Sequence, residues 1–328
     1  MQSSLGPIET VTLHNVLMAR ERIRGIASRT PLRPSLALGR DTGRAVGLKM
    51  EIMQATGAFK LRGAANCILA LDPERRRSGI VAASSGNHGR AVAYVAQKLG
   101  IPSTICVSEL VPPAKVAAVA SLDAEVIVTG PDQDAAIAAA REIATTQGRA
   151  YICPFDDPHV IAGQGTIALE IMEDWPDVET VIVQVSGGGL AAGVAMVLKT
   201  INPEIRVIGV TMERGAAMYH SLRAGKPVHV DEVATLADGL QGGVLAENRH
   251  TFGMCQRYLD EIMLVSEDQI ADAITYAFTK ERLILEGAGA CGIALLRDKR
   301  AAQLGQHIVA ICTGDNIDPG KLLEIVGD

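Results

Sequence analysis

The chain has 328 residues, 48% of them apolar and 21% charged, which is enough for a large core and for two domains or one split domain. Its net charge of −6 and its 3% aromatic content do not indicate a protein that binds nucleic acid or a membrane surface. Residues 1–10 show no basic n-region and no apolar h-region, and no apolar run is long enough to span a bilayer. The six cysteines show no paired spacing, which favours a reduced cytoplasmic protein without disulfides or a zinc site.

Short runs rich in Val and Ile alternate with Ala-rich stretches along the chain. Strands that are covered on both faces read as continuous apolar runs, so these runs predict parallel strands. We predict strands at residues 46–50, 79–83, 103–107, 125–129, 180–185, 206–211, 262–265 and 307–312. We predict helices at 12–27, 87–99, 113–121, 133–147, 160–174, 190–200, 247–260, 267–282 and 288–297, with a further helical pattern at 64–71. Asp132, Ser266 and Asp318 are suited to cap helices, and Arg75 to Arg77 are interpreted as a solvated loop.

This alternation predicts an α/β fold with helices on both faces of parallel sheets. The strand–helix units between residues 79 and 150 would form a smaller sheet, and those from 180 onward, with the N-terminal segment, a larger one. We therefore expect a small domain at 53–155 and a large domain made of 1–52 and 156–328.

Lys60 lies in the segment Thr56-Gly-Ala-Phe-Lys-Leu-Arg-Gly63, at the start of a helical pattern. A lysine between Phe59 and Leu61 is poorly placed for a solvated charge. Burial would lower its pKa and make its amine available for a Schiff base. The alternative is a lysine at a helix end that extends its amine to solvent.

Three Gly-rich segments each follow a predicted strand. In Ser84-Ser-Gly-Asn-His-Gly89, hydroxyls and backbone N–H groups at a helix start favour a carboxylate, with a capped tight turn as the alternative. In Ser186-Gly-Gly-Gly-Leu190, three successive glycines before a helix favour a phosphate site over a plain turn. Thr313-Gly-Asp-Asn316 follows the last strand, at the edge where parallel sheets bind ligands.

A dinucleotide site is a rival interpretation of the second segment. Residues 187–193 loosely fit the Gly-rich dinucleotide fingerprint, and Glu213 follows the next strand, where a ribose-binding acid would lie. This keeps a nicotinamide-dependent oxidoreductase open as a function, although it leaves Lys60 without a role.

Taken in order, these segments resemble the motifs of fold type II enzymes that use pyridoxal phosphate (PLP). Ala237-Asp-Gly239, Glu286-Gly-Ala-Gly289 and Val160-Ile-Ala-Gly-Gln-Gly-Thr166 extend the resemblance, which runs from about residue 12 to 325. It is closest to the threonine/serine dehydratase and serine racemase branch. Residues 210–218 and 235–238 resemble the dehydratases of hydroxyectoine utilisation. The resemblance implies a tryptophan synthase β-like fold, with two three-layer α/β/α domains and mostly parallel sheets.

The resemblance also implies roles for the matching residues. Lys60 would hold PLP as a Schiff base and act as the base at Cα, and Ser85 could protonate Cα from the opposite face. The cofactor would be bound by Phe59, Lys60, Asn87, Gly187, Gly188, Gly189, Leu190, Gly239, Glu286 and Thr313. The substrate carboxylate would be bound by Ser84, Ser85, Gly86, Asn87 and His88. Thr313 would face the pyridine nitrogen, where a neutral hydroxyl limits charge delocalisation into the ring and favours β-elimination over transamination.

Three features depart from the pattern of the family. Thr211 and Ala217 stand where metal-binding relatives carry acids, so we expect no metal site. Cys153 stands where many relatives have His, and Asp315 replaces a usual Gly, which calls the local backbone shape into question. We also expect no C-terminal regulatory domain.

The expected function is β-elimination of water from threonine, serine or a hydroxylated diaminobutyrate from hydroxyectoine breakdown, giving a keto product and ammonia. The nearest alternative is an amino-acid racemase such as a serine racemase. The alternatives of a different class are the oxidoreductase and a PLP-binding protein without turnover. We expect a small amino-acid substrate, a homodimer, and no nucleic-acid or membrane partner.

Overall fold

The computed structural model describes residues 10–245 and 247–327. Among these residues, contacts between Cα atoms define two compact units. The smaller unit contains residues 10–28 and 60–163, and the larger unit contains 29–59 and 164–327. These ranges differ from the expected 53–155 for the small domain, chiefly because residues 10–28 group with the smaller unit. The division into folding domains stays a prediction.

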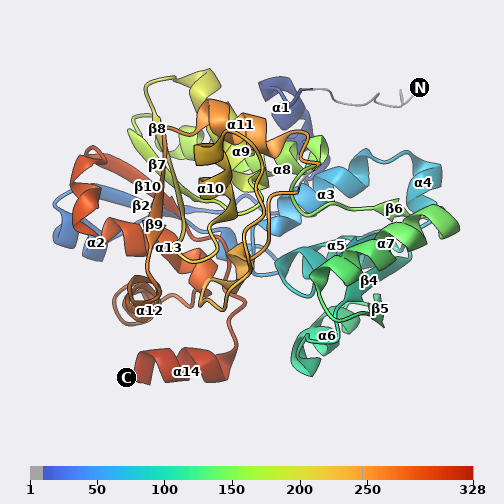
Figure 1. The fold of residues 1–328 in the computed structure, drawn as a ribbon. Helices are drawn as coiled ribbons and strands as arrows, with labels where there is room; N and C mark the ends of the chain where they lie inside the picture. The colour runs from blue at the N-terminus through green and yellow to red at the C-terminus, as the bar shows by residue number, and fades with distance from the viewer. Residues whose placement is uncertain (1–9, 246, 328) are drawn as a thin grey trace. The chain divides into compact units, whose positions relative to one another are not determined.

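The smaller unit is built on a parallel sheet in the order β5-β4-β3-β6 (Figure 1). Its strands are β3 (Ile80–Ala83), β4 (Ser103–Val107), β5 (Glu125–Val128) and β6 (Ala150–Tyr151). Its helices are α1 (Leu13–Arg22), α3 (Lys60–Ala70), α4 (Pro73–Arg77), α5 (Asn87–Leu99), α6 (Pro113–Ala120) and α7 (Gln133–Gln147). Ile80 and Ala82 pack in one apolar cluster with α3 and α5, whereas Val81 and Ala83 pack with α7. The sheet is therefore covered on both faces, as the continuous apolar runs predicted.

The larger unit is built on a sheet in the order β1-β2-β10-β7-β8-β9, in which only the β1–β2 pair is antiparallel among the described strands. Its strands are β1 (Leu32–Pro34), β2 (Ala45–Lys49), β7 (Thr180–Gln184), β8 (Arg206–Met212), β9 (Glu261–Val265) and β10 (His307–Ile311). Its helices are α2 (Leu36–Thr42), η1 (Glu51–Met53), α9 (Gly189–Ile201), α10 (Ala217–Ala224), η2 (Asp238–Leu240), α11 (Thr251–Tyr258), α12 (Glu267–Tyr276), η3 (Ala277–Glu281), α13 (Gly287–Leu296), η4 (Lys299–Gln303) and α14 (Pro319–Gly327). The boundary between the units at residue 163 falls within α8 (Pro158–Asp174).

The predicted fold class and all eight predicted strands are confirmed, with small shifts at their ends. The three predicted caps are also confirmed, because Asp132, Ser266 and Asp318 each accept a hydrogen bond from the backbone N–H three residues on. The structure adds β1 and β6, which were missed because two or three residues are too short to show a period.

Some predicted helix boundaries were wrong. Residues 75–77 are not a loop but the end of α4, where Asp72 caps the helix and Pro73 takes its first position. α1 ends at Arg22 instead of residue 27, and Gly25 has a left-handed φ of 85° just beyond it. α11 covers only Thr251–Tyr258 of the predicted 247–260.

A buried polar network supports the start of the larger sheet. The fully buried Nζ of Lys49, at the end of β2, lies 2.6 Å from Glu170 Oε2 of α8. Glu170 also accepts a hydrogen bond from the Thr30 backbone N–H, and the Thr30 hydroxyl bonds Glu51. A buried charge that loses its partner is strongly destabilising, so this pair must be kept or replaced as a whole.

We expect Glu170→Ala to lower the free energy of unfolding by about 3–5 kcal/mol, because Lys49 would keep a buried charge without its carboxylate. The matched control is Glu173→Ala on the same helix, since this half-exposed carboxylate pairs with Arg29 and should contribute less than about 1 kcal/mol. Urea unfolding of both variants measures the difference. Equal effects would show that the buried pair is not coupled in this way.

Candidate active site

The loop between β7 and α9 has the shape of an anion site. Gly189 begins α9, and no side chain caps the helix, so its first N–H groups are open to a ligand. Gly188 has a φ of 92°, which favours glycine. A Cβ at this position would lie 2.8 Å from Met218 Cε, 3.0 Å from Thr251 Cβ and 3.1 Å from Cys255 Sγ. The loop therefore accepts only glycine at residue 188, which supports the predicted phosphate site.

The segment before Lys60 is paired with the loop that follows β10. The Phe59 N–H donates to Thr313 O at 3.0 Å, and Ala58 and Gly314 form an antiparallel bridge. The Asp315 N–H donates to Gly57 O at 3.0 Å, and Asn316 Nδ2 donates to Thr56 O at 2.9 Å. Asp315 is not among the described residues with positive φ, so this backbone accepts an aspartate where a glycine was expected.

Thr313, Glu286 and Gly239 gather around this loop. Thr313, just after β10, is 2% exposed. The Glu286 N–H donates to Gly314 O at 3.1 Å, at the start of α13. A Cβ on Gly239 would lie 3.2 Å from Ala288 and 3.6 Å from Glu286 Oε1, so Gly239 lies directly against this helix start. These contacts bring the three predicted cofactor residues to one loop of the larger unit.

Gln184 is a site-supporting residue that sequence reasoning missed. Its buried side chain donates to Ile311 O at 2.9 Å and to Gly289 O at 3.4 Å, which ties the ends of β7 and β10 to α13. Its Oε1 is buried and has no protein partner among the described residues. The signal that could have revealed it is a single amide side chain inside the otherwise apolar run Val181–Val185, because a buried amide needs hydrogen-bond partners.

In the smaller unit, Lys60 is the first residue of α3 and is half-buried. Its Nζ donates to the backbone oxygen of Pro154 at 2.8 Å. His88, in the first turn of α5, hydrogen-bonds Ile152 O through Nε2 at 2.9 Å. Lys60 and His88 therefore both bind the 152–154 loop, a contact that the sequence did not indicate because a backbone carbonyl has no residue signature.

His88 is neutral in this site. Burial, together with the nearby Lys60 charge, lowers the pKa of His88 to about 3, although the bond to Ile152 O opposes the shift. A neutral ring that donates to a carbonyl carries its proton on Nε2. The one N–H of the neutral imidazole is thus used in the hydrogen bond to Ile152 O, so the ring has no donor left for a carboxylate. Only the backbone N–H of His88 could serve the predicted carboxylate site.

The remaining predicted carboxylate residues surround the start of α5. Ser84, Ser85, Gly86 and Asn87 are half-buried, and Ser84 Oγ accepts a hydrogen bond from the Gly86 N–H at 3.3 Å. Gly86 occupies the N-cap of α5 without a side-chain cap. Nearby, burial raises the pKa of the Cys153 thiol, so Cys153 stays protonated at neutral pH.

The family profile described as "Pyridoxal-phosphate dependent enzyme" matches residues 23–314. The chain belongs to this family. The enzyme is 43% identical to the L-threonine ammonia-lyase of Thermotoga maritima, over 96% of this chain and 78% of the relative. It is 39% identical to the catabolic L-threonine dehydratase of Escherichia coli, over 97% of this chain and 96% of the relative.

Solved structures agree with the fold type II assignment. Maize serine racemase superposes with a TM-score of 0.91 at 32% identity, covering 96% of each chain. The processed threonine deaminase isoform 2 of Solanum lycopersicum superposes with a TM-score of 0.88 at 36% identity, covering 96% of this chain and 87% of that one.

The cofactor of the enzyme is PLP, and the residues fit it. The uncapped start of α9 suits the phosphate, the buried Thr313 hydroxyl suits a ring atom, and Lys60 offers a primary amine. A backbone hydrogen bond joins Phe59 to Thr313, and Gly239 lies beside Glu286 at the start of α13. The individual ligand roles stay predictions.

Within residues 10–245 and 247–327, no helix combines the length and the apolar character needed to cross a membrane. Over the same ranges, no three His, Cys, Asp or Glu side chains gather closely enough to hold a metal ion. The absence of a metal requirement stays a prediction.

We expect the stability of the enzyme to fall with acid partly because of His88. Between its ordinary pKa of 6.5 and the folded value of about 3, the unfolded chain binds a proton that the folded chain does not. The contribution of neutral His88 to the free energy of unfolding is therefore fully present above pH 6.5. Below pH 6.5 it falls by up to about 1.4 kcal/mol per pH unit. His88→Gln keeps an N–H donor for Ile152 but cannot titrate, so its melting temperature should fall less steeply with acid. Parallel pH profiles for the two proteins would contradict the assignment.

Proposed function

We propose that the enzyme deaminates a β-hydroxy-α-amino acid by β-elimination and releases a keto acid and ammonia. The observation that carries the proposal is the 43% identity to an L-threonine ammonia-lyase over nearly the whole chain. A Pseudomonas L-threo-3-hydroxyaspartate ammonia-lyase, 34% identical over 95% of this chain and 98% of the relative, supports the same class of substrate.

When bound, PLP supplies an electron-withdrawing ring that stabilises negative charge at Cα. The amine of Lys60 would remove the Cα proton, and the Cβ–O bond would break as this proton passes to the leaving hydroxyl, which departs as water. Water then replaces the nitrogen, so threonine yields 2-oxobutyrate and ammonia without net oxidation. Lys60 suits this work because its Nζ lies at the start of α3, held by Pro154 O at 2.8 Å.

Two further features support elimination. The neutral hydroxyl of Thr313 does not force protonation of a ring nitrogen as a carboxylate would, which limits side reactions such as transamination. The N–H groups and hydroxyls of Ser84 to Asn87 hold the substrate carboxylate at the start of α5, where the helix dipole favours an anion. Orientation by this carboxylate site places Cα beside Lys60.

The preferred substrate within the class is threonine, serine or a hydroxylated diaminobutyrate derived from hydroxyectoine. Residues 210–218 and 235–238, which resemble hydroxyectoine dehydratases, motivate the last of these. A homodimer in the cytoplasm completes the proposal. A panel of β-hydroxy amino acids that includes 3-hydroxyaspartate, with detection of keto acid and ammonia, ranks the substrates by kcat/KM.

We expect Lys60→Ala to reduce keto-acid production by about a thousandfold or more, because the variant lacks both the covalent attachment point and the base. Borohydride reduction followed by peptide mass spectrometry should place the pyridoxyl group on Lys60 in the parent enzyme. Lys98→Ala, at an exposed position of α5, is the control and should keep the parent activity. A pyridoxyl group on another lysine would refute the assigned chemistry.

Amino-acid racemisation is a second candidate function, favoured by the TM-score of 0.91 to maize serine racemase. Ser85, half-buried beside the proposed carboxylate site, would deliver a proton to Cα from the face opposite Lys60. Elimination does not need this second proton donor.

We therefore expect Ser85→Ala to suppress racemisation at least about tenfold more than elimination. Chiral chromatography of serine, run beside keto-acid detection, measures both rates in one sample. Ser121→Ala, outside the proposed site, is the control. Equal losses of both rates would make Ser85 a binding residue only, and an enzyme without measurable racemisation removes this candidate.

A further inference from the structure

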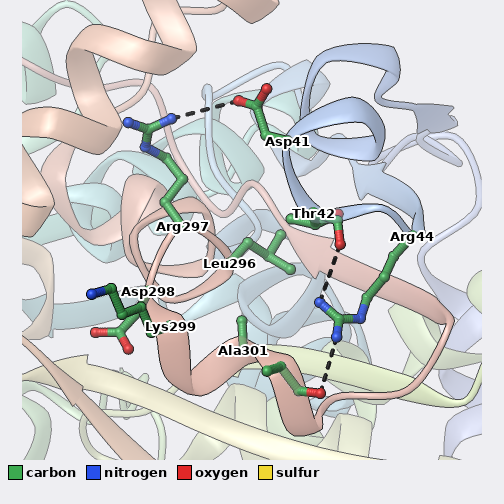
Figure 2. A pocket seen from close by; sticks show the side chains of 9 residues that line it. Asp41, Thr42, Arg44, Leu296, Arg297, Asp298, Lys299 and Ala301 are labelled. Atoms are coloured by element: carbon green, nitrogen blue, oxygen red, sulfur yellow. Dashed lines mark hydrogen bonds and ion pairs between the residues drawn. The ribbon is translucent and has the colours of Figure 1, made fainter.

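A cavity of about 310 Å³ lies within the larger unit (Figure 2). It is formed where α2 ends and leads into β2, and where α13 ends and leads into η4. Arg44 directly precedes β2, and η4 precedes β10, so the cavity lies at the amino ends of these parallel strands. The Gly188 and Thr313 loops follow the carboxyl ends of β7 and β10. The cavity is therefore separate from the proposed cofactor loops.

Arg44 is an uncompensated cation in this cavity. Its Nη2 donates to Ala302 O at 3.0 Å and its Nη1 donates to Thr42 O at 3.4 Å. Both partners are neutral carbonyl groups, and no described carboxylate pairs with Arg44. Its Nε is buried and has no hydrogen-bond partner in the described part of the chain. Two backbone carbonyls thus hold the guanidinium in place while no described carboxylate neutralises its charge, which suits recognition of an anion.

The two acids that line the cavity are already engaged. Asp41 accepts a hydrogen bond from Tyr276 Oη at 2.8 Å and lies 3.7 Å from Arg297 Nη1. Asp298 accepts bonds from Gln269 Nε2 at 2.6 Å and from Arg300 Nη2 at 2.9 Å. Both acids therefore already interact with protein donors, and neither pairs with Arg44.

Apolar side chains lie between the two arginines that line the cavity. Figure 2 shows Leu296 between Arg44 on one side and Arg297 on the other, with Ala301 below it. Arg297 stacks on the Tyr276 ring at 4.3 Å, which limits its freedom. A ligand bound to Arg44 would thus place its remaining atoms against Leu296 and Ala301.

We propose that this cavity binds a small organic carboxylate with a short aliphatic tail. The carboxylate bonds the Arg44 guanidinium, and the tail contacts Leu296 and Ala301. The volume of about 310 Å³ accommodates such a molecule and lies at the lower end of small-molecule sites. The proposal concerns binding alone and is independent of the reaction at Lys60.

Isobutyrate is the test ligand, titrated into the PLP-loaded enzyme by calorimetry, because it has the required carboxylate and tail. Arg44→Gln should weaken binding at this site by about tenfold or more, since a charge-assisted hydrogen bond is lost. The control is Arg40→Gln, which removes the same charge from an exposed position of α2 outside the cavity and should leave binding unchanged. If isobutyrate bound at the active site instead, its affinity for both variants would equal its affinity for the parent enzyme.

Arg44→Lys keeps the charge but not the planar fork, so it should show intermediate affinity and tests the proposal if Arg44→Gln is poorly folded. Isobutanol, which has the tail without the charge, should not bind. Inorganic phosphate, which has charge without a tail, should bind at least tenfold more weakly than isobutyrate. Equal isotherms for the parent and Arg44→Gln, or equally tight phosphate binding, would overturn the proposal.

Discussion

The hydrogen bond from the Phe59 amide to the Thr313 carbonyl oxygen is the contact on which the site depends. It joins the residue before Lys60 to the strand end that carries Thr313, and the Ala58–Gly314 bridge reinforces it. Lys60 therefore follows directly from a point fixed by β10. Because β10 is a central strand paired on both sides, this anchor rests on the most constrained part of the larger sheet.

The proposed phosphate loop between β7 and α9 is shaped by the side chains that pack against it. Met218, Thr251 and Cys255, from α10 and α11, fill the space that a side chain at residue 188 would occupy. The loop is thereby held with its N–H groups at the open start of α9, before any ligand arrives. Such preorganisation reduces the cost of ordering the loop when an anion binds.

In the smaller unit, backbone carbonyls hold the side chains of Lys60 and His88. Pro154 O binds the Lys60 amine, and Ile152 O binds the neutral His88 ring. A protonated His88 would add a second buried cation near Lys60, and both burial and the Lys60 charge act against it. The local electrostatics thus keep His88 neutral beside the Lys60 amine.

The sequence by itself determined the α/β class and the eight longer strands, and it singled out the glycine-rich loops and Lys60 as candidate site residues. These depend on local apolar runs and on residue types, which a chain displays without its partners. Only the tertiary structure decided the partners of Lys60 and His88, because carbonyl acceptors can belong to any residue. It also decided the short strands β1 and β6, whose formation depends on neighbouring strands. The cavity beside Arg44 was equally invisible, since it joins residues about 250 positions apart, and only packing of the folded chain brings them together.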